Sequence, residues 1–389
     1  MINRKIDFAA FISECTRISS VFLLISALYA TPLLAQPQPM SARSHALAGA
    51  IGSLSSQPDG MFANPAELIG FYRRMVSFST FRQRYSWTSG ISDSPSGSEK
   101  IIGGETKSDG YSLTYLQSYF GVAATKGSQK VELSHPLGYE DYLFSDSDFL
   151  SVRSAVCDYS SPDMITGVTA VYQKFDYKKP NQSRTTHDFF SVDVGATYFE
   201  SIYRLSFYIK YAFGQKGRTP RFDDYSRAIL LDREPRDMHI SFSLGSGTHT
   251  AFLIDVGGAY AQSAHIEPLE SEPGETETQE WGKWKTKRRV SLAVERLVSS
   301  RTVLRFGMTR GKTLRYIDYE QRKLSFDDRT TYYVGANLNT NRIQAEVALG
   351  YHRRLGSKGD NPLQSEFYDE IFDTKERLFT VVSTLNFIF

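Results

Sequence analysis

The chain has 389 residues, with 45 basic and 43 acidic side chains, which leaves a formal net charge of +2. This balance provides no field that would attract nucleic acid and argues against a nucleic-acid partner. The mean hydropathy of −0.34, without a second long apolar run after the N-terminus, excludes a helical protein that crosses a membrane many times. A transmembrane β-barrel stays open, because its strands are only half apolar.

The N-terminus has the features of a secretory signal peptide. Basic residues precede the apolar run 21–30, and Ala35 offers a cleavage site. We therefore expect residues 1–35 to be removed on export. An N-terminal membrane anchor is the alternative, but the run is short for a hydrocarbon core about 30 Å thick. Export would leave Cys157 as the single cysteine, so no internal disulfide is expected.

Residues 36–70 differ in character from the rest of the chain. They are rich in Gly, Ala and Ser and lack the alternation of a strand. The segment is too long for a leader and too poor in large side chains to form its own core, so we expect it to pack inside a larger structure, for which the lumen of a barrel would be available. Within it, Pro65 disfavours helical geometry at Asn64 and can begin a short helical turn that runs to Leu68.

From Met75 onward, the sequence alternates between apolar and polar residues in segments of about ten residues, the length of a tilted transmembrane strand. The even number of segments is typical of bacterial single-chain barrels. The fourteen predicted strands are 75–84, 110–119, 121–134, 150–158, 164–176, 188–199, 202–213, 237–246, 250–261, 286–297, 302–311, 329–339, 342–353 and 376–389.

The connectors alternate in kind along the chain. The predicted short turns are Phe120, 159–163, 200–201, 247–249, 298–301 and 340–341. The predicted long polar loops are 85–109, 135–149, 177–187, 214–236, 262–285, 312–328 and 354–375. Short periplasmic turns and long extracellular loops characterise outer-membrane barrels. We therefore predict an all-β, fourteen-stranded antiparallel transmembrane barrel over residues 71–389, with both termini in the periplasm.

The two faces of individual strands predict the orientation of the barrel wall. In the segment 202–213, Leu205 and Phe207 lie on one face, and Arg204 and Lys210 lie on the other. The apolar face must be outside, because each basic residue near the middle of the membrane would cost roughly 2–4 kcal/mol.

The final segment, 376–389, alternates and stops on Phe389. It resembles the closing strand of bacterial outer-membrane barrels, in which a terminal aromatic residue is part of the assembly signal. The resemblance implies that the barrel-assembly machinery recognises this strand. We expect it to pair with the first strand, 75–84, and to close the barrel.

The N-terminal segment contains a run of small residues with Gly-Ala, a turn with Asp, and then Asn-Pro-Ala before an apolar residue. The residues of this pattern are Gly49, Ala50, Asp59, Phe62, Asn64, Pro65, Ala66 and Leu68. With this pattern the segment resembles that of the FadL-type outer-membrane transport family for hydrophobic compounds, and of the related PorV-like barrels. Glu67 stands where the family pattern commonly has Gly. The motif match covers the N-terminal segment, and the architectural match covers the whole exported chain.

This resemblance implies a hatch inside a fourteen-stranded barrel. Ligand would enter from outside and leave by local rearrangement of the hatch or through the wall. The hatch and ligand-path residues would be Phe62, Asn64, Pro65, Ala66 and Leu68. The plainer alternative is that these residues only seal the lumen and move nothing.

The faces assigned to the lumen carry charges of both signs. Glu295 and Arg305 flank a predicted turn so symmetrically that they should face each other across a hairpin. A ladder of ion pairs that holds barrel and hatch is favoured over an ion-selective constriction. The predicted lumen charges are Asp193, Arg204, Lys210, Asp255, Glu295, Arg305, Arg342 and Glu346.

The sequence offers little for enzymatic chemistry. No His and Cys cluster has metal-ligand spacing. His239 and His352 are predicted to face the lumen, but their strands are not neighbours, so no serine, histidine and acid set is indicated. We expect neither catalysis, a metal nor another cofactor.

The leading hypothesis is a monomeric outer-membrane barrel, surrounded by membrane lipid, through which a small hydrophobic ligand, fatty-acid-like or aromatic, diffuses passively. The alternative is a PorV-like barrel that transports nothing and serves as a scaffold or shuttle for protein secretion.

Overall fold

The structure, a computed structural model, describes residues 41–50, 58–68, 74–93, 98–133, 146–178, 185–200, 203–213, 217–219, 227–231, 236–246, 249–260, 263–268, 279–317, 322–340, 342–355 and 368–389. The expected signal peptide and residues 36–40, 51–57 and 69–70 of the expected hatch lie outside this part of the chain.

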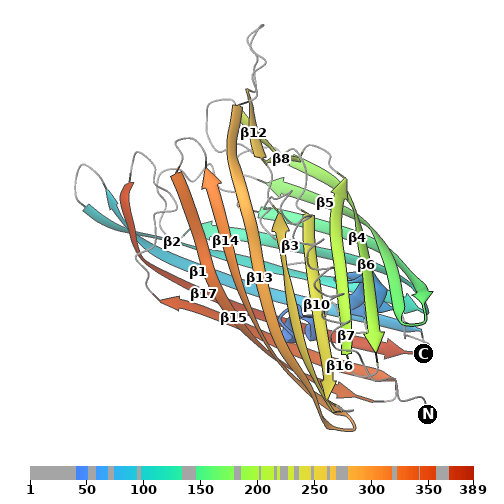
Figure 1. Ribbon diagram of the computed structural model, residues 1–389. Coiled ribbons are helices and arrows are strands. Elements are labelled where there is room, and N and C mark those ends of the chain that lie inside the picture. The colour runs from blue at the N-terminus through green and yellow to red at the C-terminus, as the bar shows by residue number, and fades with distance from the viewer. Residues whose placement is uncertain are drawn as a thin grey trace, which may run out of the picture.

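Fourteen antiparallel strands of the described chain form a closed ring (Figure 1). Strand β7 pairs with β10, β11 pairs with β13, and β17 pairs with β1 to close the ring. Each predicted segment overlaps one strand of the ring, so the predicted all-β, fourteen-stranded antiparallel barrel is confirmed. The strands are β1 (Met75–Asp93), β2 (Ser98–Gln117), β3 (Phe120–Leu133), β4 (Asp146–Ser161), β5 (Met164–Lys178), β6 (Thr185–Glu200), β7 (Tyr203–Phe213), β10 (Arg236–Ser246), β11 (Thr250–Tyr260), β13 (Gln279–Ser299), β14 (Thr302–Ile317), β15 (Arg322–Asn339), β16 (Ile343–Leu355) and β17 (Tyr368–Ile388).

Pairing extends farther on the long-loop side than the apolar alternation predicts. Strands β1 and β2 stay paired as far as Asp93 and Ser98, within the predicted loop 85–109. A strand with water on both faces keeps its main-chain hydrogen bonds without an apolar period of two, so the pattern does not detect it. Three short strands also lie in predicted loops: β8 (Gly217–Thr219), β9 (Arg227–Leu231) and β12 (Ser263–Pro268).

The first short turn is shifted by one residue from its prediction. It comprises Ser118 and Tyr119, and Tyr119 has a positive φ of 68°. This left-handed conformation reverses the chain within two residues. Phe120, predicted as the turn, therefore opens β3 opposite Gln117.

The two faces of the ring differ in composition. On β17, Thr380, Thr384 and Asn386 are buried, whereas Phe379 is 48% exposed. The same alternation appears elsewhere in the ring, and it places polar side chains toward the lumen and apolar side chains outside. The predicted orientation of the wall is therefore confirmed.

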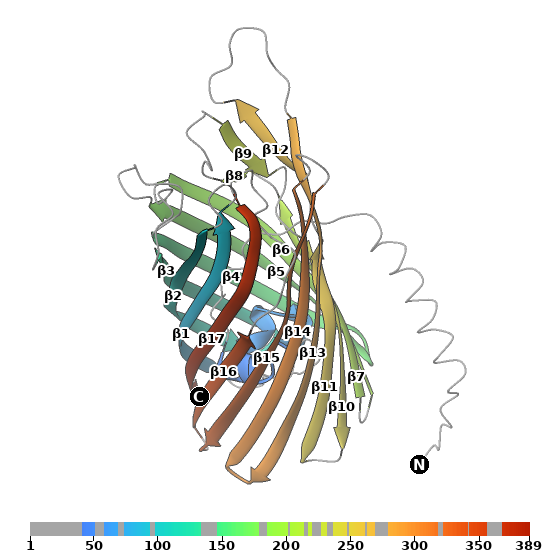
Figure 2. The same cartoon turned by 90° about the vertical axis from the view of Figure 1, so that its left-hand side faces the viewer.

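Inside the ring lie three short helical elements, which Figure 2 shows in blue: α2 (Ala42–Ala46), η1 (Pro58–Met61) and η2 (Pro65–Leu68). We call residues 41–50 and 58–68 the inner segment; nearly all of its side chains are buried. In the described ranges, no helix is long and apolar enough to cross a membrane.

The outer face of β16 provides a test of the wall's orientation. Val347 and Ile343 are equally exposed on this face, at 44% and 42%. Val347→Arg places a charge near the middle of the apolar band and should lower the free energy of unfolding by about 2–4 kcal/mol, whereas Ile343→Arg, at the short-turn end, should cost about 0–1 kcal/mol. Denaturant titration in lipid vesicles measures both. Equal costs would contradict the orientation.

Candidate functional site

Hydrogen bonds tie the inner segment into one unit. Ser41 caps α2 and donates from its hydroxyl to the Asp59 carboxylate, which joins α2 to η1. Asn64 Oδ1 accepts from the Ala66 N–H at 3.1 Å. The helical turn of η2 begins at Pro65, as its sequence predicts.

Two glycines make room for η2 on one wall. Gly167 of β5 and Gly195 of β6 lie opposite each other in register. A Cβ at Gly195 would lie 1.8 Å from Asn64 Oδ1, and a Cβ at Gly167 would lie 2.5 Å from the carbonyl carbon of Pro65. Both distances are too short for any side chain, so η2 rests directly on the main chain of the wall. We call Gly167 and Gly195 the first glycine notch.

Glu67 fastens η2 beside this notch. Its buried carboxylate accepts hydrogen bonds from Thr197 Oγ1 at 2.6 Å and from Ser206 Oγ at 3.1 Å. The Arg204 guanidinium lies 3.5 Å from the second carboxylate oxygen. Burial raises the pKa of Glu67, although Arg204 and the two hydroxyls oppose the change. Asn64 Nδ2 donates to the same Thr197 hydroxyl at 3.0 Å, so two residues of the inner segment share one partner on β6.

A second pair of glycines receives α2 on a distant wall. Gly307 of β14 and Gly335 of β15 are separated from the first notch by several strands in both directions around the ring. A Cβ at Gly307 would lie 2.6 Å from the Ala46 carbonyl oxygen, and a Cβ at Gly335 would lie 2.4 Å from Ala46 Cβ. The inner segment therefore spans the lumen between two walls that both lack side chains at the contact. We call this pair the second glycine notch.

Arg43 adds an ionic contact beside the second notch. Its guanidinium donates two hydrogen bonds to the Glu295 carboxylate, at 3.0 and 2.9 Å. Arg305 Nε donates to the same carboxylate at 2.6 Å, and its Nη2 lies 3.6 Å from Glu346. Glu295 and Arg305 are direct cross-strand partners, as their spacing predicts. Glu346 also accepts from Asn337 Nδ2 at 2.8 Å.

Arg153 is a lumen charge that the sequence analysis did not predict. It donates to Asp193 at 3.1 Å and to the Met61 carbonyl at 3.3 Å, and it lies 5.3 Å from the centre of the Phe62 ring. Lys210 Nζ donates to the Phe62 carbonyl at 2.6 Å. Arg153 lies at an inward-facing position in the alternation of β4, and this position could have identified it as a lumen charge.

The two remaining lumen charges lie apart from these contacts. Asp255 is buried and pairs with Arg289 at 3.4 Å. The Arg289 guanidinium packs near Gly49 at the end of the α2 turn. Arg342 does not join the lumen group. Strand β16 begins one residue later, so Arg342 belongs to the preceding turn and its side chain is exposed.

The residues that the family resemblance assigns to the ligand path make two kinds of contact. Asn64 and Pro65 lie against the first glycine notch. Phe62, Ala66 and Leu68 pack with wall residues of β1–β5 in one apolar cluster. The structure therefore brings all five to the side of the ring formed by β1–β6.

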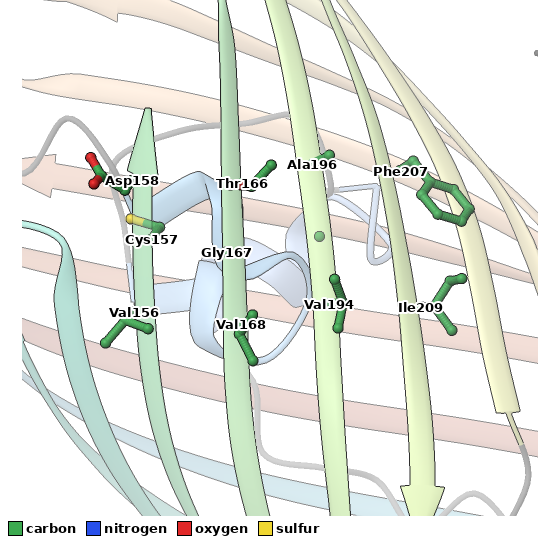
Figure 3. A pocket seen from close by; sticks show the side chains of 11 residues that line it. Val156, Cys157, Asp158, Thr166, Gly167, Val168, Val194, Ala196, Phe207 and Ile209 are labelled. Carbon is green, nitrogen blue, oxygen red and sulfur yellow. The ribbon is translucent and has the colours of Figure 1, made fainter. Parts of the chain in front are cut away.

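An open groove of about 640 Å³ lies over β4–β7 at the first notch. Figure 3 shows Val156, Val168 and Val194 around it, with the inner segment on the far side of the strands. These three valines are among the exposed apolar residues of the wall. Because Gly167 and Gly195 carry no side chains, only main chain separates the groove from η2.

Among the described residues, no group of three or more His, Cys, Asp and Glu side chains is placed to hold a metal ion. His352 is buried on β16, with Nδ1 2.5 Å from the Thr330 carbonyl oxygen. His239 belongs to β10, which is not a neighbour of β16 in the ring.

No protein-family model and no curated protein matches the sequence. Solved structures do match. A FadL homologue from Pseudomonas aeruginosa superposes with a TM-score of 0.61 at 11% identity, over 92% of this chain and 99% of that one. The toluene transporter TbuX from Ralstonia pickettii has a TM-score of 0.58 at 11% identity, over 90% and 99% of the two chains.

This chain has the FadL-type barrel fold. The toluene transporter TodX from Pseudomonas putida shares it, with a TM-score of 0.57 at 9% identity over 93% of this chain and all of that one. At this identity the common property is the FadL-type fold, and the roles of individual residues rest on the contacts described above.

Gly195→Ala tests the first glycine notch. The added Cβ collides with Asn64 Oδ1, so η2 should be displaced from the wall. We expect amide hydrogen exchange of residues 64–68 to accelerate by about tenfold, which corresponds to about 1.4 kcal/mol. Gly350→Ala is the matched control, because its Cβ would meet the Tyr333 ring and not the inner segment. If residues 64–68 exchange at the same rate in the two variants, η2 is not held by its contact with Gly195.

The raised pKa of Glu67 predicts a pH dependence of docking. A raised pKa means that the docked segment binds the proton more tightly than the undocked one. This stabilisation is complete below the ordinary pKa of 4.5 and declines as the pH rises through the raised value. Hydrogen exchange of residues 64–68, corrected for intrinsic rates, should therefore accelerate above about pH 4.5. Glu67→Gln should remove this pH dependence, whereas Glu200→Gln, at an exposed site, should keep it. If the exchange of residues 64–68 in Glu67→Gln still depends on pH in the same way, Glu67 is not the group responsible.

Proposed function

We propose that this chain is a monomeric outer-membrane barrel through which a small hydrophobic compound, fatty-acid-like or aromatic, diffuses passively, with residues 36–70 acting as a hatch. The observation that carries the proposal is the seating of η2 on the first glycine notch, directly behind an apolar groove in the wall. The fold shared with a FadL homologue and two toluene transporters supports the same function class.

The proposed path follows the apolar side of the inner segment. The lumen charges beside it are paired, as in the contacts of Glu295 with Arg43 and Arg305, so an apolar compound meets few open charges. Phe62 and Leu68 are buried against apolar residues of β1–β5, and a movement of the inner segment would expose this apolar surface. A shift of η2 away from the first notch would bring a compound on this surface to the main chain behind the groove.

The proposed orientation places both termini in the periplasm. Phe389 donates its N–H to the Arg74 carbonyl at 2.9 Å, and Ile388 donates to the Arg342 carbonyl at 2.8 Å. The last strand therefore ends beside the short turns, which are periplasmic in barrels of this kind. On this proposal, the barrel-assembly machinery would recognise the same end of the wall.

A PorV-like scaffold for protein secretion is the second candidate. The observation that favours it is the attachment of the inner segment to two distant walls, through both glycine notches and the Arg43–Glu295 pair. A barrel whose inner segment never moves would have such contacts. The two candidates differ in uptake, which only the transporter provides.

Deletion of residues 36–70, with the signal peptide kept, tests the hatch. We expect a folded barrel with higher permeability to small polar solutes, because the inner segment no longer fills the lumen. Liposome swelling measures permeability, and uptake of toluene or a long-chain fatty acid by a strain lacking the protein measures transport. The full-length chain should restore uptake without swelling. Failure of the full-length chain to restore uptake of either compound, while it still co-purifies with a secreted protein, would favour the scaffold.

A further inference from the structure

Five charged side chains gather where the inner segment meets the wall beside the second notch. Arg43 and Asp59 belong to the inner segment, and Glu295, Arg305 and Glu346 belong to β13, β14 and β16. Arg43 and Arg305 share the Glu295 carboxylate, and Arg305 also lies 3.6 Å from Glu346. Four of the five are buried, and Glu295 is partly buried. We call these five residues the charge cluster.

The charge cluster contains three carboxyl groups and two guanidinium groups. If all five are ionised, one negative charge is in excess. Glu295 and Glu346 each lie within ion-pair distance of a guanidinium, whereas Asp59 contacts no cation in the described part of the chain. Asp59 Oδ1 accepts from the Ser41 hydroxyl, and Oδ2 is buried without a hydrogen-bond partner among the described residues. Burial of this kind strongly disfavours an ionised carboxylate.

The neighbouring carboxylate of Glu346 increases this cost. Its Oε2 is also buried without a hydrogen-bond partner in the described ranges, and its charge repels that of Asp59. Hydrogen bonds from water would not remove the excess charge, whereas one proton would. Because Arg305 lies against Glu346 and no cation contacts Asp59, Asp59 is the carboxyl group that the proton should occupy.

The elements packed against η1 do not supply the missing positive charge. From η2, Glu67 lies against Arg204. From β4, Arg153 is buried with Asp193 at 3.1 Å, and Cys157 is an uncharged thiol. The buried residues described on β2 and β3 are all uncharged. These groups therefore leave the balance of the charge cluster unchanged.

Two more basic groups lie near the inner segment. Lys210 stands opposite Asp193 in register and donates to the Phe62 carbonyl. Lys210 is only partly buried, so water and salt screen its charge. His45 of α2 packs against Tyr333, with ring centres 6.3 Å apart, and burial lowers its pKa to about 4. His45 is therefore uncharged at neutral pH and does not compensate Asp59.

We propose that Asp59 holds a proton at neutral pH while the inner segment is docked, and that loss of this proton loosens the end of the segment formed by α2 and η1. The Ser41 hydroxyl transmits the change, because it caps α2 and also donates to Asp59. The proton site itself is independent of the compound that the barrel conducts. Only its consequence for permeability rests on the proposed hatch.

The sign of the pH dependence follows from the two states of Asp59. Burial raises its pKa, although Ser41, Arg43 and Arg305 oppose the change. The docked segment therefore binds the proton more tightly than the undocked one. Docking is strongest below the ordinary pKa of 3.8 and weakens as the pH rises, until the docked carboxyl group itself ionises.

Hydrogen exchange of residues 42–50 in the full chain, corrected for intrinsic rates, tests the proposal. In the unmodified chain, exchange should accelerate by up to about tenfold for each pH unit above the ordinary pKa. Asp59→Asn keeps an oxygen for Ser41 and carries no charge. It should remove this pH dependence and slow exchange at neutral pH by at least about tenfold. Glu200→Gln, at an exposed site, should behave as the unmodified chain does.

The opposite result has a distinct meaning. If Asp59 is ionised and supports docking through Arg43 and Arg305, Asp59→Asn removes a favourable charge and exchange at neutral pH becomes faster. Faster exchange in this variant, or an unchanged pH dependence, would overturn the proposal. The difference in gel mobility between unheated and heated samples reports whether each variant is folded.

Infrared spectroscopy provides a measurement on the unmodified chain, which serves even if Asp59→Asn does not fold. With aspartate isotopically labelled at its side-chain carboxyl group, the spectrum at neutral pH should contain a band of a protonated carboxyl group that shifts with the label. Asp59→Asn should lack this band and Glu200→Gln should keep it. Absence of any aspartate-derived band from the unmodified chain would overturn the proposal.

Liposome swelling separates this inference from the proposed function. On the proposed hatch, permeability to small polar solutes should rise with pH in the unmodified chain and stay constant in Asp59→Asn. If exchange and the infrared band behave as expected but swelling does not change with pH, the proton site stands and the proposed hatch is contradicted.

Discussion

The pairing of β1 with β17 is the contact on which the rest of the structure depends. Residues from Met75 to Asp93 are partnered along β17, and the opposite edge of β1 is partnered by β2, so the wall has no free edge here. In hydrocarbon, each unpaired main-chain group would cost several kcal/mol, which makes closure obligatory for a sheet that crosses a membrane. Closure also creates the enclosed lumen that the inner segment occupies.

Within that lumen, the inner segment is held where the wall lacks side chains. The Asn64 side chain at Gly195, and the Ala46 Cβ at Gly335, occupy the space that a side chain on the wall would need. Close packing of this kind positions a segment without relying on charge. The first notch combines it with the hydroxyl contacts of Glu67, and the second combines it with the two hydrogen bonds between Arg43 and Glu295. The two ends of the inner segment are thus held by different chemistry.

Charges on the two faces of the wall have different environments. Inside, Asp193, Glu295 and Glu346 each have a cationic partner, and removal of one partner would leave a buried charge uncompensated. Such pairs contribute little net stability compared with apolar packing, but they restrict where the inner segment can dock. Outside, the Glu105 carboxylate contacts both Arg84 and Lys107 at the surface of the wall, where water is present.

The sequence by itself determined the strand count, the two faces of the wall and the Glu295–Arg305 hairpin pair, because each depends on a period of two or on residues close in the chain. It also placed the helical turn at Pro65. The tertiary structure alone decided that Arg153 meets Met61, that Arg43 meets Glu295, and that Gly167 and Gly195 lie under η2. These contacts join residues far apart in the chain, and they depend on how the strands are staggered when the ring closes, which no local pattern encodes.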